Sequence, residues 1–169
     1  MSTEVTNAKC RGEQRITNHL PSKDLLLEAC AGTVALPHPL LLAAYELASL
    51  HEARHAADPE ALAEIDCTRA RLIHDIDCWT AQELPRPYAA AALHTETVGM
   101  VIDRIAQFSV DAYTALSSPA SECRLHYAWK RLAELSLAYA DLSHDLTART
   151  RRIPDYTTPH PEDLQHQQI

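Results

Sequence analysis

Residues 58–83, DPEALAEIDCTRARLIHDIDCWTAQE, decide the fold class of this chain. Asp58 is a good N-cap residue, and proline at the first helical position makes the start signal stronger. Prolines at positions 85 and 87 stop the pattern. Between these signals, apolar residues recur at helical spacing: Leu62, Ile65, Leu72, Ile76 and Trp79. The stretch therefore predicts an amphipathic helix from Pro59 to about Glu83.

Caps, prolines and helical periodicity predict four more helices around this one. A short helix begins at the Ser22 cap and stops before Gly32. The fifth helix opens with Ser118-Pro119, the same cap-then-proline signal as at Asp58. The expected ranges are Ser22 to Cys30, a second helix that starts after Pro37-His38-Pro39 and runs to about Ala57, about Leu93 to Leu116, and Ser118-Pro119 to about Arg151.

Long helices joined by short loops favour antiparallel neighbours. We therefore expect an all-α fold, an up-down-up-down four-helix bundle with a short additional N-terminal helix. The content of only three glycines and one phenylalanine argues against sheets and barrels. The polar residues 1–20 and the proline-rich residues 153–169 are typical of disordered tails. One helical domain over residues 21–152 is predicted between them.

Charge and composition exclude several classes of function. The formal net charge of −8 offers no electrostatic footprint for nucleic acid. The richest apolar stretch, Leu40 to Leu50, is about half a membrane span and contains Glu46, so no membrane partner is expected. The five cysteines form no CxxC pair and no signal-peptide pattern is present, which favours a cytoplasmic protein with reduced thiols. No glycine-rich phosphate loop occurs.

Few polar residues fall on the predicted apolar stripes, and these are the candidate site residues. Arg69 lies at the centre of the stripe of the 59–83 helix, with Asp66 three residues earlier on its border. His51 lies on the stripe of the preceding helix at about the same depth. Two interpretations remain open: an internal ion pair that fixes helix register, or an anion pocket in which Arg69 donates and His51 acts as acid or base. His94, at the start of the next stripe, is either a core histidine or a further catalytic candidate.

Two carboxylate-x-x-His spacings, Glu52 to His55 and Asp141 to His144, are similar to those of di-iron bundles. The two motifs fall at opposite ends of the expected bundle, and both carboxylates point outward. The sequence therefore predicts no metal site and no cofactor.

Four stretches together resemble an uncharacterised helical family, domain of unknown function 4254. They are AAYELASLHEARH (43–55), AEIDCTRARLIHDIDCWT (63–80), LHTETVGMVIDRI (93–105) and WKRLAELSLAYADL (129–142). The resemblance covers about residues 24–152 and implies an all-helical fold, while the family brings no established reaction, substrate or cofactor. The motif positions hold His51 and Glu52, Asp66 and Arg69, His94 and Glu96, and Asp103 and Arg104. On a helical wheel Glu96 and Asp103 face outward, opposite the stripe that begins at His94.

Two functional hypotheses follow. The first is a small binding or accessory protein that acts through its surface and self-associates. The second helix is apolar almost all round in its first half, so Leu41 and Leu42 need a second cover. A homodimer through this helix or the short first helix would supply that cover, and a small anionic ligand or a protein partner fits the same hypothesis. The alternative is an enzyme acting on a small anionic metabolite in a pocket lined by His51, Asp66, Arg69 and His94.

Overall fold

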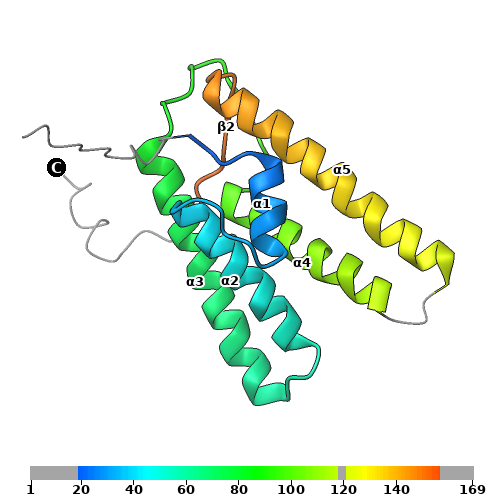
Figure 1. The fold of residues 1–169 in the computed structure, drawn as a ribbon. Helices are drawn as coiled ribbons and strands as arrows, with labels where there is room; N and C mark the ends of the chain where they lie inside the picture. The colour runs from blue at the N-terminus through cyan, green and yellow to red at the C-terminus, as the bar shows by residue number, and fades with distance from the viewer. Residues whose placement is uncertain (1–18, 118–120, 157–169) are drawn as a thin grey trace, which may run out of the picture.

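The computed structural model describes residues 19–117 and 121–156 of the chain. The all-α bundle with a short extra N-terminal helix is confirmed (Figure 1). Two-residue strands are the other regular elements in the described ranges. The elements are α1 (Lys23–Cys30), α2 (Pro39–Arg54), α3 (Pro59–Glu83), β1 (Ala92–Leu93), α4 (Val98–Ser117), α5 (Glu122–Thr147) and β2 (Arg151–Arg152).

The capping signals explain where most helices begin. The Ser22 side chain accepts a hydrogen bond from the Leu25 amide at the start of α1, and Asp58 Oδ1 accepts from the Ala61 amide, 2.9 Å away, at the start of α3. Gly32, with φ of +99°, ends the first helical segment as expected. Helix α5 is capped by Ser121; the predicted start at Ser118-Pro119 lies outside the described residues.

Three helix ends differ from the predicted ranges. Helix α4 starts at Val98, because residues 92–93 pair in parallel with residues 151–152 and Thr97 Oγ1 accepts a hydrogen bond from the Met100 amide. Helix α5 stops at Thr147, and Arg149 follows with a left-handed φ of +65°. Helix α2 stops at Arg54, so the predicted end near residue 57 was three residues too late.

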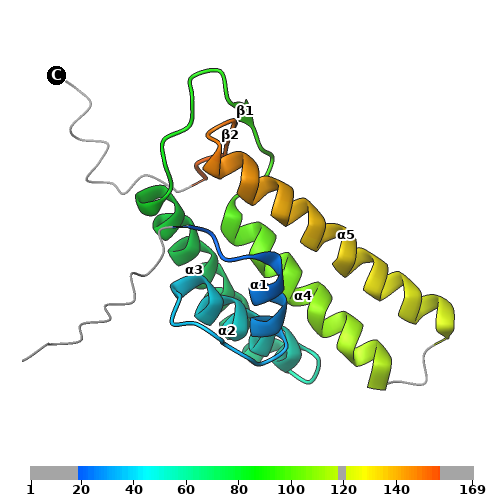
Figure 2. The ribbon, with the colours of Figure 1, turned by 45° about the horizontal axis from the view of Figure 1, so that its top comes forward.

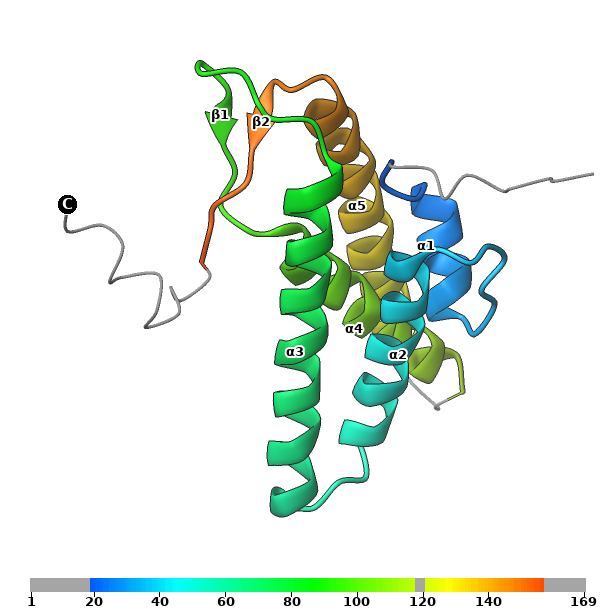
Figure 3. The ribbon, with the colours of Figure 1, turned by 90° about the vertical axis from the view of Figure 1, so that its left-hand side faces the viewer.

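Helix α4 is the centre of the bundle. Helices α2 and α3 pack on one side of it, α5 packs on the other, and α1 bridges α2, α4 and α5. Among the described helices, α5 makes no packing contact with α2 or α3. The α2–α3 pair and the α4–α5 pair therefore diverge (Figures 1 and 2), and Figure 3 shows α2 lying beside α3. A central helix must bury two faces, which is decisive for the site described below.

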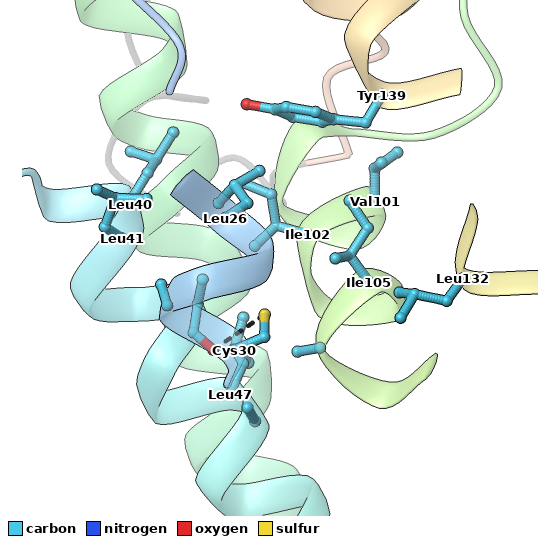
Figure 4. Packing of buried hydrophobic residues seen from close by; sticks show 14 of the residues in the cluster. Leu26, Cys30, Leu40, Leu41, Leu47, Val101, Ile102, Ile105, Leu132 and Tyr139 are labelled. Carbon is cyan, nitrogen blue, oxygen red and sulfur yellow. Dashed lines mark hydrogen bonds between the residues drawn. The ribbon is translucent and has the colours of Figure 1, made fainter. Parts of the chain in front are cut away.

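The core lies where α1 inserts between α2, α4 and α5 (Figure 4). Leu26, Leu41 and Ile102 are fully buried there, and each such side chain contributes about 1.5–3 kcal/mol relative to exposure. Tyr139 of α5 is also buried, and its hydroxyl donates to the Pro21 carbonyl oxygen at 2.8 Å. Of the two leucines expected to need a second cover, Leu41 is buried within the same chain, whereas Leu42 is 50 % exposed.

The described structure continues past the expected domain boundaries at both ends. Leu20 is buried, and Ile153 packs against the core. Of the tails predicted over residues 1–20 and 153–169, residues 1–18 and 157–169 lie outside the described residues. None of the described helices is both long enough and apolar enough to cross a lipid bilayer.

Candidate functional site

Helix α4 carries two buried faces. One holds the apolar stripe that the sequence predicts, with Val101 and Ile105 among its members. The second face turns toward α2 and α3 and holds small or polar residues at spacings of four, three and four: Gly99, Asp103, Ala106 and Val110. A side chain at Gly99 would place its Cβ 2.4 Å from the Ile73 carbonyl oxygen. Glycine is therefore what lets α3 approach α4 closely at this point.

A cluster of ion-paired side chains lies on that second face, and we call it the ion cluster (His51, Arg54, Asp66, Arg69 and Asp103). At its buried end the Asp103 carboxylate accepts from two helices. Arg69 of α3 donates from Nε to Oδ1 at 3.1 Å and from Nη2 to Oδ2 at 2.6 Å. His51 Nε2 of α2 lies 2.9 Å from the same Oδ1. One carboxylate thus joins three helices.

The ion cluster extends from this buried end to the surface. Arg69 Nη1 also donates to Asp66 Oδ1 at 2.9 Å, the i to i+3 contact that the sequence predicts. Arg54 Nη1 of α2 lies 3.0 Å from the same oxygen. The Asp66 side chain is 48 % exposed, against 12 % for Asp103. Asp66 is therefore the solvated end of the ion cluster and Asp103 its buried end.

The electrostatics favour charged forms at the buried end. Burial opposes ionisation of Asp103, but the hydrogen bonds and positive charges of His51 and Arg69 outweigh it and hold the pKa of that carboxyl below its usual range. Burial likewise acts to lower the pKa of Arg69, yet Asp103 and Asp66 raise it overall. Two arginines balance two aspartates, so the ion cluster is close to neutral when His51 is uncharged.

The structure brings three of the four predicted site residues together. His51, Asp66 and Arg69 all belong to the ion cluster. His94 lies apart from it: its Nδ1 is 3.2 Å from the Glu96 amide nitrogen and 3.0 Å from the Glu96 carbonyl oxygen, in the loop before α4.

The outward placement of two acidic residues was wrong. Asp103 is buried, because α4 has a second buried face opposite the predicted stripe. Glu96 lies before the start of α4 and pairs with Arg104, at partial burial. The missed signal was the second stripe of residues 99, 103, 106 and 110, in which Gly99 and Ala106 are small enough for a closely packed helix.

A cavity of about 590 Å³ lies elsewhere, beside the C-terminal half of α3. Its walls come from α3, the loop after it, the start of α4 and the segment 151–156. The lining includes apolar residues (Ile73, Leu84, Met100, Leu146 and Ile153) and charged ones (His74, Asp77, Arg86, Arg151, Arg152 and Asp155). A second cavity of about 320 Å³ lies between α2 and α4. No member of the ion cluster lines either of these two cavities.

Asp77 joins the cavity wall to the start of α4. Its Oδ1 accepts a hydrogen bond from the Gly99 amide at 2.8 Å, so a side chain of α3 caps a neighbouring helix. Burial raises the pKa of Asp77, although the hydrogen bonds from Gly99 and Thr97 oppose that shift. Within residues 19–117 and 121–156, no group of three or more His, Cys, Asp or Glu side chains is placed to hold a metal ion.

Comparison with known proteins assigns the chain to a family. The family model described as "Protein of unknown function (DUF4254)" matches residues 49–154, well over half of the chain. The chain belongs to this family. Neither the curated proteins nor the solved structures give a match. The resemblance inferred from the four sequence stretches is therefore confirmed.

The match to the DUF4254 model covers some parts of the molecule and leaves others out. All five residues of the ion cluster fall inside residues 49–154, as does the cavity wall apart from residues 155 and 156. Helix α1 and the first half of α2 lie outside the matched range. The DUF4254 segment thus contains both candidate sites, the ion cluster and the cavity.

Proposed function

We propose that the protein is a binding protein that takes up a small molecule with an apolar body and an acidic group in the cavity beside α3. One observation carries this proposal. The cavity places three arginines, Arg86, Arg151 and Arg152, around an apolar lining in a protein whose net charge is −8.

The size and chemistry of the cavity support a ligand of this class. Small-molecule sites are typically about 300–1,000 Å³, mostly apolar, with a few polar groups that fix orientation. Arg151 forms an ion pair with Asp145, with Nη2 2.9 Å from Oδ2. Arg152 uses its Nε to donate to the Ala91 carbonyl oxygen at 3.3 Å, and Arg86 is exposed on the cavity wall. A guanidinium offers the planar pair of donors that a carboxylate or phosphate accepts.

The enzymatic alternative has less support from the geometry. The Asp103 carboxylate uses both oxygens on His51 and Arg69, and Arg69 donates through all three of its nitrogens. A carboxylate engaged on both oxygens, with an arginine engaged at all three nitrogens, suits a clamp between helices better than a pocket for an anion. We therefore assign the ion cluster a positioning role and place ligand binding at the cavity.

A thermal-shift titration tests the binding proposal. A ligand that binds only the folded state raises the melting temperature with concentration. We expect medium-chain carboxylates and aryl phosphates to raise it, and their neutral amide or alcohol analogues to have no effect. Replacing Arg86 and Arg152 with Ala should abolish the shift, whereas Arg71→Ala, an exposed arginine of α3 that does not line the cavity, should retain it. Equal shifts in both variants would contradict the proposal.

The proposal includes self-association and a cytoplasmic location. Exposed Leu42 and Tyr45 stand three residues apart on α2, which supports contact with a second copy of the chain. Four cysteines in the described ranges are free thiols, which supports a reducing compartment.

A further inference from the structure

A thiol and an imidazole lie side by side on the wall of the large cavity. Cys78 and His74 are one helical turn apart on α3, and Cys78 Sγ lies 3.3 Å from His74 Nε2. Both residues line the cavity of about 590 Å³. Cys78 is partly exposed and His74 exposed, so a molecule in the cavity can reach the sulfur.

The pairing matters because the thiolate, not the thiol, is the nucleophile. An adjacent imidazole can take the thiol proton and then stabilise the thiolate as an imidazolium. Asp77 lies close enough to His74 for their charges to interact. The Cys78 and His74 side chains therefore have the composition of an activated thiol.

The other described thiols lack this environment. Cys30 is buried, and burial raises its pKa to about 12, which keeps it protonated and unreactive. Cys67 and Cys123 are exposed, but neither contacts an imidazole within the described residues. Cys67 stands on the same helix as Cys78, so it serves as an internal reference.

We propose that Cys78 and His74 form a reactive thiol–imidazole pair that exchanges with small anionic disulfides in the cavity. The charge preference rests on the proposed function, because it invokes the arginines that line the same cavity. The thiolate of Cys78 attacks one sulfur of the small disulfide. A new S–S bond forms to Cys78, the original S–S bond breaks, and the departing thiolate takes the proton held by His74. Cys78 becomes a mixed disulfide, one half of the reagent leaves as a thiol, and no further oxidant is needed.

Three alkyl disulfides of different charge test this reaction on the full chain. They are dithiodipropionate (anionic), bis(2-hydroxyethyl) disulfide (neutral) and cystamine (cationic). Cys10, outside the described residues, is replaced by Ser. The rate of mixed-disulfide formation at each cysteine is followed by acid quenching and peptide mass mapping. Ratios between cysteines within one reagent cancel the intrinsic reactivity of that reagent.

We expect Cys78 to react about tenfold or more faster than Cys67 and Cys123 with the anionic disulfide. With cystamine, the ratio of the Cys78 rate to the rates of Cys67 and Cys123 should be about threefold or more lower. His74→Gln should remove the advantage with all three reagents, whereas His126→Gln, an exposed histidine on α5, should change nothing. Arg86→Ala combined with Arg152→Ala should remove only the preference for the anion. Unchanged melting curves show that each variant is folded.

The two proposals fail in different ways. If Cys78 reacts no faster than Cys67, or keeps its advantage in His74→Gln, the thiol–imidazole pair is overturned, while the thermal-shift result for carboxylates stands. If Cys78 is fast but shows the same ratio toward anionic and cationic disulfides, the anionic ligand class is overturned here and in the proposed function.

Discussion

Arg69 and Asp103 form a two-bond ion pair between α3 and α4, with 3.1 Å from Nε to Oδ1 and 2.6 Å from Nη2 to Oδ2. His51 of α2 contacts the same carboxylate, so three helices meet at one acidic side chain. A carboxylate with cationic or hydrogen-bonding partners on both oxygens fixes the relative register of the elements that it joins. This pair is therefore the main polar restraint on how the α2–α3 hairpin sits on α4.

Asp103→Ala should be strongly destabilising. It leaves a largely buried guanidinium and a buried imidazole without their acceptor, and breaking a buried pair by removing one partner costs about 3–5 kcal/mol. The free energy of unfolding, measured by urea denaturation at pH 7, gives the value directly.

Asp66→Ala is the matched control. Asp66 contacts the same arginine but is half exposed, and exposed pairs contribute about 0–1 kcal/mol. If Asp66→Ala and Asp103→Ala lowered the free energy of unfolding equally, the ion cluster would have no buried end.

The stabilising effect of Asp103 should depend on pH in a defined direction. Its partners lower its pKa in the folded protein, so the folded state binds this proton less tightly than the unfolded chain does. The stabilisation is present above the unfolded pKa of about 3.9 and is lost as the pH falls through the lower folded value. The difference in unfolding free energy between the natural chain and Asp103→Asn should shrink below about pH 4. A difference that stays constant from pH 7 to pH 3 would contradict this assignment.

The ionised carboxylate of Asp77 should destabilise the folded protein, which is the opposite of the effect of Asp103. Burial raises its pKa, so the folded state favours the neutral form and the ionised carboxylate destabilises the protein at neutral pH. Asp77→Asn keeps an oxygen for the Gly99 amide and removes the charge. We expect a higher melting temperature than the natural chain at pH 7 and no difference near pH 3. A lower melting temperature at pH 7 would mean that the charge itself supports the start of α4.

The burial of Asp103 was not predicted from the sequence, whereas other features were. Caps and periodicity predict α1 and α3 closely, and the stripe centre in residues 59–83 correctly selects Arg69 with Asp66 as its partner. The same method assigns one buried face to each helix. Helix α4 is central and buries two, so the most important acidic residue falls on the face taken as solvent.

The cavity could not be predicted for a different reason. Its walls join α3 to the segment 151–156, and β1 pairs with β2 to hold that segment in place. Strands of two residues carry no periodicity, and their pairing spans about sixty positions of sequence. Only the tertiary structure brings Cys78, His74 and the arginines around one space.

Gly99→Ala should destabilise the protein although alanine favours helices. The gain in helix propensity is about 1 kcal/mol, but the new Cβ would lie 2.4 Å from the Ile73 carbonyl oxygen and 3.0 Å from Asp77 Oδ1. The contact with backbone forces α3 and α4 apart, and overpacking of this kind costs about 1–3 kcal/mol. We expect a net loss by urea denaturation. Gln107→Ala, exposed on the same helix, should stay within about 0.5 kcal/mol of the natural chain.

Leu42 provides the test of self-association. It is 50 % exposed on α2, with Tyr45 at 43 % three residues further along, whereas Leu41 is buried within its own chain. A contiguous apolar surface of this kind on an acidic protein favours a twofold contact, in which the same patch meets itself.

Light scattering at micromolar concentration should give the mass of a dimer. Leu42→Glu should give a monomer with an unchanged circular dichroism spectrum, because the substitution places two like charges across the twofold axis. Leu137→Glu, which alters a leucine of α5 that is 58 % exposed, should leave the dimer intact. A monomeric natural chain, or dissociation by Leu137→Glu alone, would rule out this contact surface.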